Sequence, residues 1–539
     1  MPLLSGRMEA IMKRLKKVLL IGMAVSMLFT AVGCGEKESV ISEGNGEIPK
    51  TLTIFGSMGD YAIKAGAKDN NDTLFFQMME EKTGCHIEWN HPAAGAGEEK
   101  FNLMVASGKL PDLIIHNWST LSDGAKKYAD DGIIIPLREL IEKSMPNLAQ
   151  YNKDNPHIAK QYVDDSGEIY YIPVIRHDPE LKIFQGPQIR QDWLEKLGLN
   201  APTTPEELYN VLKAFKTQDP NGNGKADEIP MSGVKFEKTS QAIGNLLWQF
   251  GVANGFYVKD GDVKYGILEP EFEEGLKYIT KLYKEGLIDK DYLINDRDKM
   301  DNKVMNDKVG FVYSLQPGNY YRNMNDGTRK VVGIPHLRAE GVKDNVFDTS
   351  YVQDVVATSI AVTTANKNPS GTLRWLDEFF SEDGIQIMNY GKEGLTFEFD
   401  ENKEPVFTDY ILNNPDGKSS SEMCGMNIGT YATGFPTVQL WGYYKQILTP
   451  WGKESIETWG GSANAQGVVP SLSFTEEESK TIANVMSQIE TFVSEKVNKI
   501  VIGNASIDEL SAIRSRVEKM GIDEIIKIYN NALKRYNDR

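Results

Sequence analysis

The order of strand and helix patterns over residues 51–115 constrains the fold most strongly. Thr51–Phe55 and Cys85–Trp89 alternate as strands do, and Pro111–Ile115 is a short apolar run typical of a buried strand. Helical patterns separate them, from Asp72 to Gly84 and from Glu98 to Ser107. Because strands that alternate with helices form parallel βαβ units, the sequence predicts an α/β fold.

Length and charge narrow the class further. The chain has 539 residues, which is enough for more than one domain, and its 40% hydrophobic and 25% charged content is that of a soluble globular protein. Its formal net charge is −17. This acidity argues against binding nucleic acid, which requires a basic face, and against direct adhesion to anionic lipid.

The amino-terminal segment has the parts of an export signal. Lys13–Lys17 is basic, Val18–Val32 is apolar and uncharged, and the run ends at Gly-Cys34. The four residues ending at Cys34 resemble a lipobox, although alanine stands where leucine is usual. We expect a signal peptide over residues 1–33, a lipidated Cys34 (diacylglyceryl, palmitate) and a tether over residues 34–50. The alternative is an ordinary secretory signal with a chance cysteine.

A loop after a predicted helix has the spacing of a calcium site. The oxygen donors that we expect to act are Asp219, Asn221, Asn223, Lys225 through its carbonyl, Asp227 and Glu228. Hard oxygen ligands at this spacing, with Gly224 at the sixth position, suit Ca²⁺ as in an EF-hand. Pro230 stands at the twelfth position, so Glu228 replaces the usual final carboxylate. The alternative is a glycine-rich surface turn that binds no ion.

The residues around this loop carry a family resemblance. Gln188–Leu199, Pro202–Leu208 and Ala214–Lys216 precede it, and Leu373–Phe380 and Asn389–Gly394 come later. This pattern resembles the family 1 extracellular solute-binding proteins, in particular large lipoproteins of Gram-positive ABC sugar importers and their alginate-binding relatives. The resemblance implies a two-lobed periplasmic-binding-protein-like fold of type II, with the ligand cleft between the lobes. It also implies that the calcium is structural.

The same resemblance predicts how the chain is divided between the lobes. The chain is expected to cross between them near Pro173 and Ser359. We expect an N-terminal lobe of residues 51–175 and about 359–415, and a C-terminal lobe of residues 176–358 and about 416–539. Ligand binding then selects the closed state of a hinge.

Aromatic and polar residues near glycines and crossings are the candidates for the cleft. The ligand-binding prediction comprises Trp118, Arg176, Arg190, Trp248, Glu393 and Trp441. Flat rings stack on the apolar face of a pyranose, and planar polar groups bind its hydroxyls. For any one tryptophan, core packing is the competing role, and Arg190 has the alternative of pairing with Asp192. We expect an oligosaccharide, with an acidic one as an option that depends on Arg176 and Arg190.

Several catalytic patterns are missing from the sequence. It contains no phosphate-binding loop with Lys-Ser/Thr and no Gly-x-Ser-x-Gly nucleophile turn, so ATP hydrolysis requires a separate protein. Paired catalytic carboxylates remain open, because sequence does not give their separation. Three cysteines do not make a disulfide framework; Cys85 and Cys424 either pair or lie buried as small apolar residues.

These observations predict a non-enzymatic solute receptor, monomeric and attached to the outer face of the cell membrane only through its lipid. Its expected partners are an oligosaccharide, the permease subunits of an ABC importer and a separate ATPase. Two alternatives remain: a secreted cell-surface carbohydrate-active enzyme, and a peptide-binding receptor with the same fold.

Overall fold

The computed structural model of the chain describes residues 43–118, 124–183, 185–237, 239, 241–315, 329–342, 352–462 and 465–539. The expected signal peptide, Cys34 and the first part of the expected tether lie outside these residues. Within the described ranges, no helix combines the length and the apolar character that crossing a bilayer requires. Residues 43–539 form one compact unit, and the description below concerns this unit.

The first sheet confirms the predicted parallel βαβ units. Its strands follow the order β11-β3-β1-β2, with bounds Thr358–Val362, Leu113–Asn117, Thr51–Phe55 and His86–Asn90. β1 pairs in parallel with β2 and β3, whereas β11 runs antiparallel to β3. The connecting helices α3 (Leu74–Thr83) and α4 (Gly97–Ser107) end at the left-handed glycines Gly84 and Gly108. The carboxyl end of β3 therefore leads directly to Trp118.

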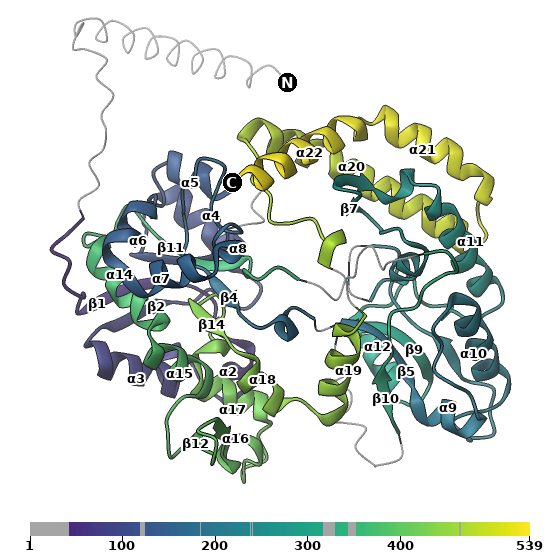
Figure 1. Cartoon of the computed structure of the whole chain (residues 1–539), viewed down its shortest axis with the longest axis horizontal. Coiled ribbons are helices and arrows are strands. Elements are labelled where there is room, and N and C mark those ends of the chain that lie inside the picture. Colours follow the sequence, from purple (N-terminus) through teal and green to yellow (C-terminus); the bar gives the residue numbers. More distant parts are fainter. Residues whose placement is uncertain are drawn as a thin grey trace, which may run out of the picture. The chain divides into compact units, whose positions relative to one another are not determined.

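Helices from two separate parts of the chain belong to the same lobe as the first sheet (Figure 1). They are α2 (Asp60–Ala65), α6 (Arg138–Ser144), α14 (Pro369–Asp377), α15 (Glu382–Tyr390), α17 (Ser420–Asn427) and α18 (Trp441–Ile447). α17 packs against α2 and α3, and α14 packs against α6. The short hairpin of β12 (Phe397–Phe399) and β13 (Pro405–Phe407) shares a core cluster with α17 and α18.

These contacts differ from the expected division near residue 416. Met423, Cys424 and Tyr443 are buried with Phe397 and Phe407, on the side of the first sheet. After α18 the chain returns to the second sheet with α19 (Pro450–Gly460), which packs on β10 (Val331–Gly333) and β5 (Gln185–Arg190). An apolar helix face shows that a helix is covered, but it does not show which sheet covers it.

The second sheet has the order β10-β5-β9-β6, with bounds Val331–Gly333, Gln185–Arg190, Val309–Leu315 and Ile229–Met231. β5 is antiparallel to both β9 and β10, and β6 is parallel to β9. Beside it lie α9 (Gln191–Leu197), α10 (Pro205–Thr217), α11 (Glu271–Lys284) and α12 (Arg297–Met305). In Figure 1 this group surrounds β5, β9 and β10, apart from the group around β1, β2 and β11. The chain thus forms the two lobes that the sequence predicts.

The three carboxyl-terminal helices join the core of the second lobe. α20 (Glu476–Val501) packs against α11, and it also packs against α21 (Leu510–Lys519) and α22 (Ile522–Asp538). α20, α21 and α22 are drawn in yellow shades in Figure 1. α22 also packs on β8 (Asp262–Tyr265), which forms a hairpin with β7 (Phe256–Lys259). Asp260 and Gly261 form the turn of this hairpin, and both residues have positive φ. α22 is thus held in place by contacts with other second-lobe elements.

The crossing segments lie side by side. β4 (Val174–Arg176) pairs in parallel with β14 (Thr437–Gln439). The Val356 N–H donates to the Val174 carbonyl at 2.9 Å, and the Arg176 N–H donates to the Asp354 carbonyl at 2.7 Å. Ser359 itself lies in β11 of the first sheet, so this crossing immediately precedes it.

Thr204 caps the start of α10 by accepting from the Glu207 N–H at 3.2 Å. The Glu207 carboxylate accepts from Thr203 rather than from Thr204, so these two residues do not form a reciprocal capping box. Cys85 and Cys424 are free and buried, and burial raises the pKa of the Cys85 thiol to about 12.

Candidate functional site

A cavity of about 1040 Å³ lies between segments of the two lobes. First-lobe residues on its wall include Trp118, Ala125, Lys126, Lys127, Asp130, Gln161, Tyr162, Asp164, Asp165, Tyr170 and Tyr171. Second-lobe residues include Gln185, Glu237, Asn245, Trp248, Asn254, Phe256, Phe474, Glu476 and Tyr529. Residues from both lobes thus form a single cleft, the arrangement that lets hinge motion enclose a ligand.

Tyr162, Tyr170 and Tyr171 lie on the first-lobe wall. Tyr170 donates its hydroxyl to Asp164 Oδ2 at 3.2 Å, and Tyr162 donates to Asn152 Oδ1 at 2.5 Å. Burial raises the pKa of Tyr171 to about 12 and raises those of Tyr162 and Tyr170 as well. These phenols therefore stay protonated at neutral pH and keep the rings uncharged.

Stacked rings form part of the second-lobe wall. Phe256 and Tyr529 stack with centroids 4.2 Å apart, and Phe474 lies 5.0 Å from Tyr529. Trp248, which is only 8% exposed, belongs to the second-lobe core and still reaches the cavity wall. Aromatic faces of this kind bind apolar or sugar-like surfaces.

Neighbouring groups balance the charges on the wall. Lys126 pairs with Asp130 at 2.7 Å, and Lys127 pairs with Asp131 at 2.5 Å. Among the described wall residues, these two lysines are the cationic side chains, against the acids Asp130, Asp164, Asp165, Glu237 and Glu476. The cleft is therefore neutral to acidic.

Two of the six predicted ligand residues lie on this wall. Trp118 has no exposed surface, packs against Phe101 and Tyr128, and donates its indole N–H to the Ser359 carbonyl at 3.0 Å. It supports the wall from behind. Trp248 is the other one.

The other four lie elsewhere among the described residues. Arg190 is 1% exposed, is paired with Asp192 at 2.5 Å and with Asp307, and lies over the Trp193 ring. The Arg176 guanidinium donates to the Gln353 carbonyl at 3.1 Å. Glu393 is exposed in its turn. The backbone N–H of Trp441 donates to the Asp178 carboxylate. For Arg190, pairing with Asp192 is therefore the alternative that the structure shows.

The sequence reasoning missed most of the wall. Tyr170 and Tyr171 lie in a segment recognised only as a crossing, and the position of two tyrosines beside a hinge could have marked them. Phe256, Phe474 and Tyr529 are far apart in the chain. No local pattern brings these three together.

The predicted cation loop lies between α10 and β6, and none of its six predicted ligands lines the cleft. The Asp219 carboxylate accepts from the Asn223 and Gly224 N–H groups at 3.1 and 3.0 Å. Asn221 Oδ1 accepts from the Asn223 N–H at 3.0 Å, and Asn223 Oδ1 from the Lys225 N–H at 2.7 Å. The loop is thus wound around its own side-chain oxygens.

The carboxylate at the end of the loop tests whether these residues fit a cation. Glu228 Oε1 is buried and has no hydrogen-bond partner. Burial, followed by the charges of Asp219 and Asp227, raises the pKa of Glu228. No three His, Cys, Asp or Glu side chains in the described ranges form a metal cluster by themselves, so amide and carbonyl oxygens must complete the set. A hard cation that accepts mixed oxygen ligands fits this loop.

Comparisons with known proteins agree with this architecture. The chain is 27% identical over 494 residues to the fructooligosaccharide ABC transporter substrate-binding protein FusA of Streptococcus pneumoniae, covering 87% of this chain and 88% of that one. It is 26% identical to lipoprotein LipO of Bacillus subtilis over 74% of this chain and 76% of that one.

Solved structures extend the likeness. The structure of S. pneumoniae FusA in complex with kestose is 27% identical in sequence, with a TM-score of 0.71. The match covers 90% of this chain and 99% of that one. The alginate-binding protein AlgQ2, solved without calcium ion, is 24% identical with a TM-score of 0.69 over 90% of this chain and 98% of that one, and shares the fold. The family model for bacterial extracellular solute-binding proteins matches residues 56–386. The chain belongs to the bacterial extracellular solute-binding protein family.

Proposed function

We propose that this chain is the lipid-anchored substrate-binding component of an ABC importer and captures an oligosaccharide for a membrane permease. The observation that carries the proposal is the 1040 Å³ cleft between the lobes, with aromatic rings on both walls. Its volume lies just above the roughly 300–1,000 Å³ of ordinary small-molecule sites. A chain of several sugar units suits it better than a monosaccharide. FusA, a relative, is the substrate-binding protein of a fructooligosaccharide ABC transporter, which supports the same class of ligand.

We further propose that the oligosaccharide is neutral. An acidic glycan requires Arg or Lys groups that can turn to its carboxylates. Arg176 and Arg190 lie outside the wall, and Lys126 and Lys127 are paired with aspartates. The wall carries five acids against two lysines, so it offers a polyanion little positive charge, whereas neutral hydroxyls can donate to the carboxylates.

The test is a matched panel of neutral fructo-, gluco- and galacto-oligosaccharides and of oligogalacturonates of equal length. Binding is followed by calorimetry and by tryptophan fluorescence, with a reducing-end assay on the same samples. Saturable binding of a neutral member without new reducing ends supports the proposal. Cleavage of a bound saccharide contradicts the receptor function, and preference for uronates contradicts only the neutral class.

Anchoring and delivery form the second part of the proposal. The segment that ends at Cys34 has the composition of a lipoprotein signal, and LipO, a relative, is named as a lipoprotein. A receptor held at the outer face by its lipid keeps a captured ligand near the permease. The protein itself then needs only to bind, since a separate ATPase supplies the energy.

A structural Ca²⁺ in the loop of residues 219–228 is the third part. The orphaned Glu228 oxygen and the inward carboxylate of Asp219 are the groups that an ion would neutralise. Because the loop anchors the end of α10 to β6 and lies away from the cleft wall, the ion would stabilise the second lobe rather than touch the ligand.

A further inference from the structure

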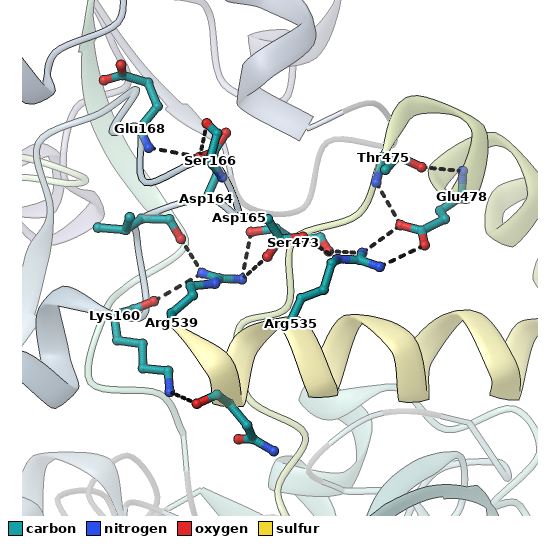
Figure 2. Close-up of polar contacts among 12 residues, drawn as sticks. Lys160, Asp164, Asp165, Ser166, Glu168, Ser473, Thr475, Glu478, Arg535 and Arg539 are labelled. Atoms are coloured by element: carbon teal, nitrogen blue, oxygen red, sulfur yellow. Dashed lines mark hydrogen bonds and ion pairs between the residues drawn. The ribbon is translucent and has the colours of Figure 1, made fainter.

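A set of ion pairs at the edge of the cleft joins Asp165 to Arg535 of α22 and to Arg539, which directly follows that helix (Figure 2). Arg535 Nε lies 2.5 Å from Asp165 Oδ2, and Arg539 donates to Asp165 Oδ1 at 2.7 Å. Arg539 also donates to the carbonyls of Val163 and Lys160. One carboxylate is thus held from both sides by two guanidinium groups.

The two sides of this cluster belong to different lobes. The segment of Asp165 is fixed to the first lobe, since the Leu137 N–H donates to the Ile169 carbonyl at 2.7 Å and the Arg138 N–H donates to Glu168 at 2.8 Å. α22 is fixed to the second lobe, where Asn530 makes two hydrogen bonds to the Val263 backbone, at 2.8 and 3.0 Å. The ion pairs therefore span the cleft.

The same arginines hold a third segment, which lines the cavity. Arg535 donates to the Ser473 carbonyl at 3.0 Å, and Arg539 donates to Ser473 Oγ at 3.1 Å. Arg535 also pairs with Glu478 at 2.8 Å, and Glu478 in turn caps α20 through Thr475 (Figure 2). Asp165 and Ser473 both lie on the cavity wall, so the contacts that join the lobes also shape the cleft.

Partial burial makes these pairs stronger than ordinary surface pairs. The side chain of Arg539 is 11% exposed and that of Asp165 is 26% exposed. Surface ion pairs contribute little because water screens them, whereas partly buried, multiply hydrogen-bonded pairs are costly to break. Opening the lobes at this edge would break all the Asp165 contacts together.

We propose that Arg535, Arg539 and Asp165 form an interlobe clamp that stabilises the arrangement of the lobes seen here. The clamp needs no ligand, because each of its contacts is made within the chain. Its strength sets how often the ligand-free cleft opens, and therefore how readily a solute enters. This inference does not depend on which solute binds.

The test measures the distance between the lobes in the ligand-free protein. Dyes on Lys153→Cys in the first lobe and Lys290→Cys in the second report this distance by energy transfer, in a Cys34→Ser background. Cys85 and Cys424 are buried and stay unlabelled. We expect Asp165→Asn and Arg539→Gln each to lower the ratio of closed to open molecules by about tenfold or more. The double variant should add little, because the two residues share one contact.

Lys499→Gln is the matched control, since it removes an exposed ion pair with Glu495 on α20 away from the clamp. It should leave the distance distribution unchanged. Melting curves identify variants that fail to fold, and Arg539→Gln, at the end of its helix, is the variant least able to disturb the core. If folded Asp165→Asn and Arg539→Gln keep the distances of the parent protein, the clamp does not exist. A loss of melting temperature without a change in distance also overturns it.

Discussion

The ring of Tyr529 in α22 stacks on the ring of Phe256 in β7, with centroids 4.2 Å apart and planes 17° from parallel. These two residues lie far apart in the sequence, yet both lie on the wall of the cleft. Trp248 lies on the same side. The aromatic surface that a saccharide would contact is therefore assembled from β7, α22 and the short helical segment Ile243–Phe250, which carries Trp248.

The first prediction concerns this surface. Trp248→Ala and Tyr529→Ala should each weaken saccharide binding by about 1–3 kcal/mol, since each removes a ring face from the wall. Trp441→Ala, which removes an aromatic ring outside the wall, should leave the affinity unchanged. Calorimetric titration of the best neutral ligand measures the effect, with melting temperatures to confirm folding. An equal loss in all three variants would show that ring removal acts through stability alone.

The second prediction concerns Ca²⁺. An ion that binds only the folded state adds about 2.7 kcal/mol to the free energy of unfolding at a hundred times its Kd. A chelator should therefore lower the melting temperature, and Asp219→Ala should abolish that response, whereas Asp416→Ala on the surface should retain it. A folded protein whose melting temperature ignores both chelator and added Ca²⁺ would exclude the ion.

The third prediction concerns the anchor. With Cys34 lipidated, the protein should partition into the detergent phase and remain with the cells. Cys34→Ser should release it into the medium, because the apolar segment before it is removed as a signal peptide. Fractionation followed by immunoblotting compares the two forms, with Cys424→Ser as the cysteine control. Release of both forms to the same extent would favour the ordinary secretory signal.

The fourth prediction concerns pH. Burial raises the pKa of Asp301 from its ordinary value of 3.8 to about 6, although the charge of Arg297 opposes the shift. Asp301 Oδ1 is buried and has no hydrogen-bond partner. The folded state thus binds the proton more tightly than the unfolded state. Above pH 6 the buried Asp301 is ionised, and its full destabilisation of the folded state is present. As pH falls from about 6 toward 3.8, the folded state takes up the proton first, and this destabilisation is removed.

Asp301→Asn should therefore raise the free energy of unfolding by about 2–3 kcal/mol at pH 7.5 and by little near pH 4. Denaturant titrations at the two pH values measure the difference. Asp416→Asn, at an exposed position that does not contribute to the pKa shift of Asp301, serves as the comparison. A stabilisation that is equal at both pH values would show that titration of Asp301 is not its cause.

Local patterns in the sequence determined much of the fold. Alternation of apolar residues predicted β1, β2 and β3, and the glycines that end α3 and α4 occur where the pattern stops. The Asp260-Gly261 turn and the start of α10 at Pro205 were equally readable. Each of these depends on residues a few positions apart, and their conformational preferences act without the rest of the chain.

The candidate site was predicted only in part, because its residues come together from distant positions. Arg190 looked available beside a crossing, but the structure buries it between Asp192 and Asp307. A charge that leaves water must be paired, and the sequence does not show that Asp307 supplies the partner. Of the predicted tryptophans, Trp118 and Trp248 reach the wall, whereas Trp441 does not.

The sequence by itself determined the α/β class, the family and the oxygen spacing of the loop at residues 219–228, since these are written in neighbouring residues. Only the tertiary structure decided which rings and charges face the cleft, that Ser420–Asn427 packs beside the first sheet, and that Asp165 meets Arg535 and Arg539. The physical reason is that burial and ion pairing are properties of contacts. Those contacts are made by segments up to several hundred residues apart.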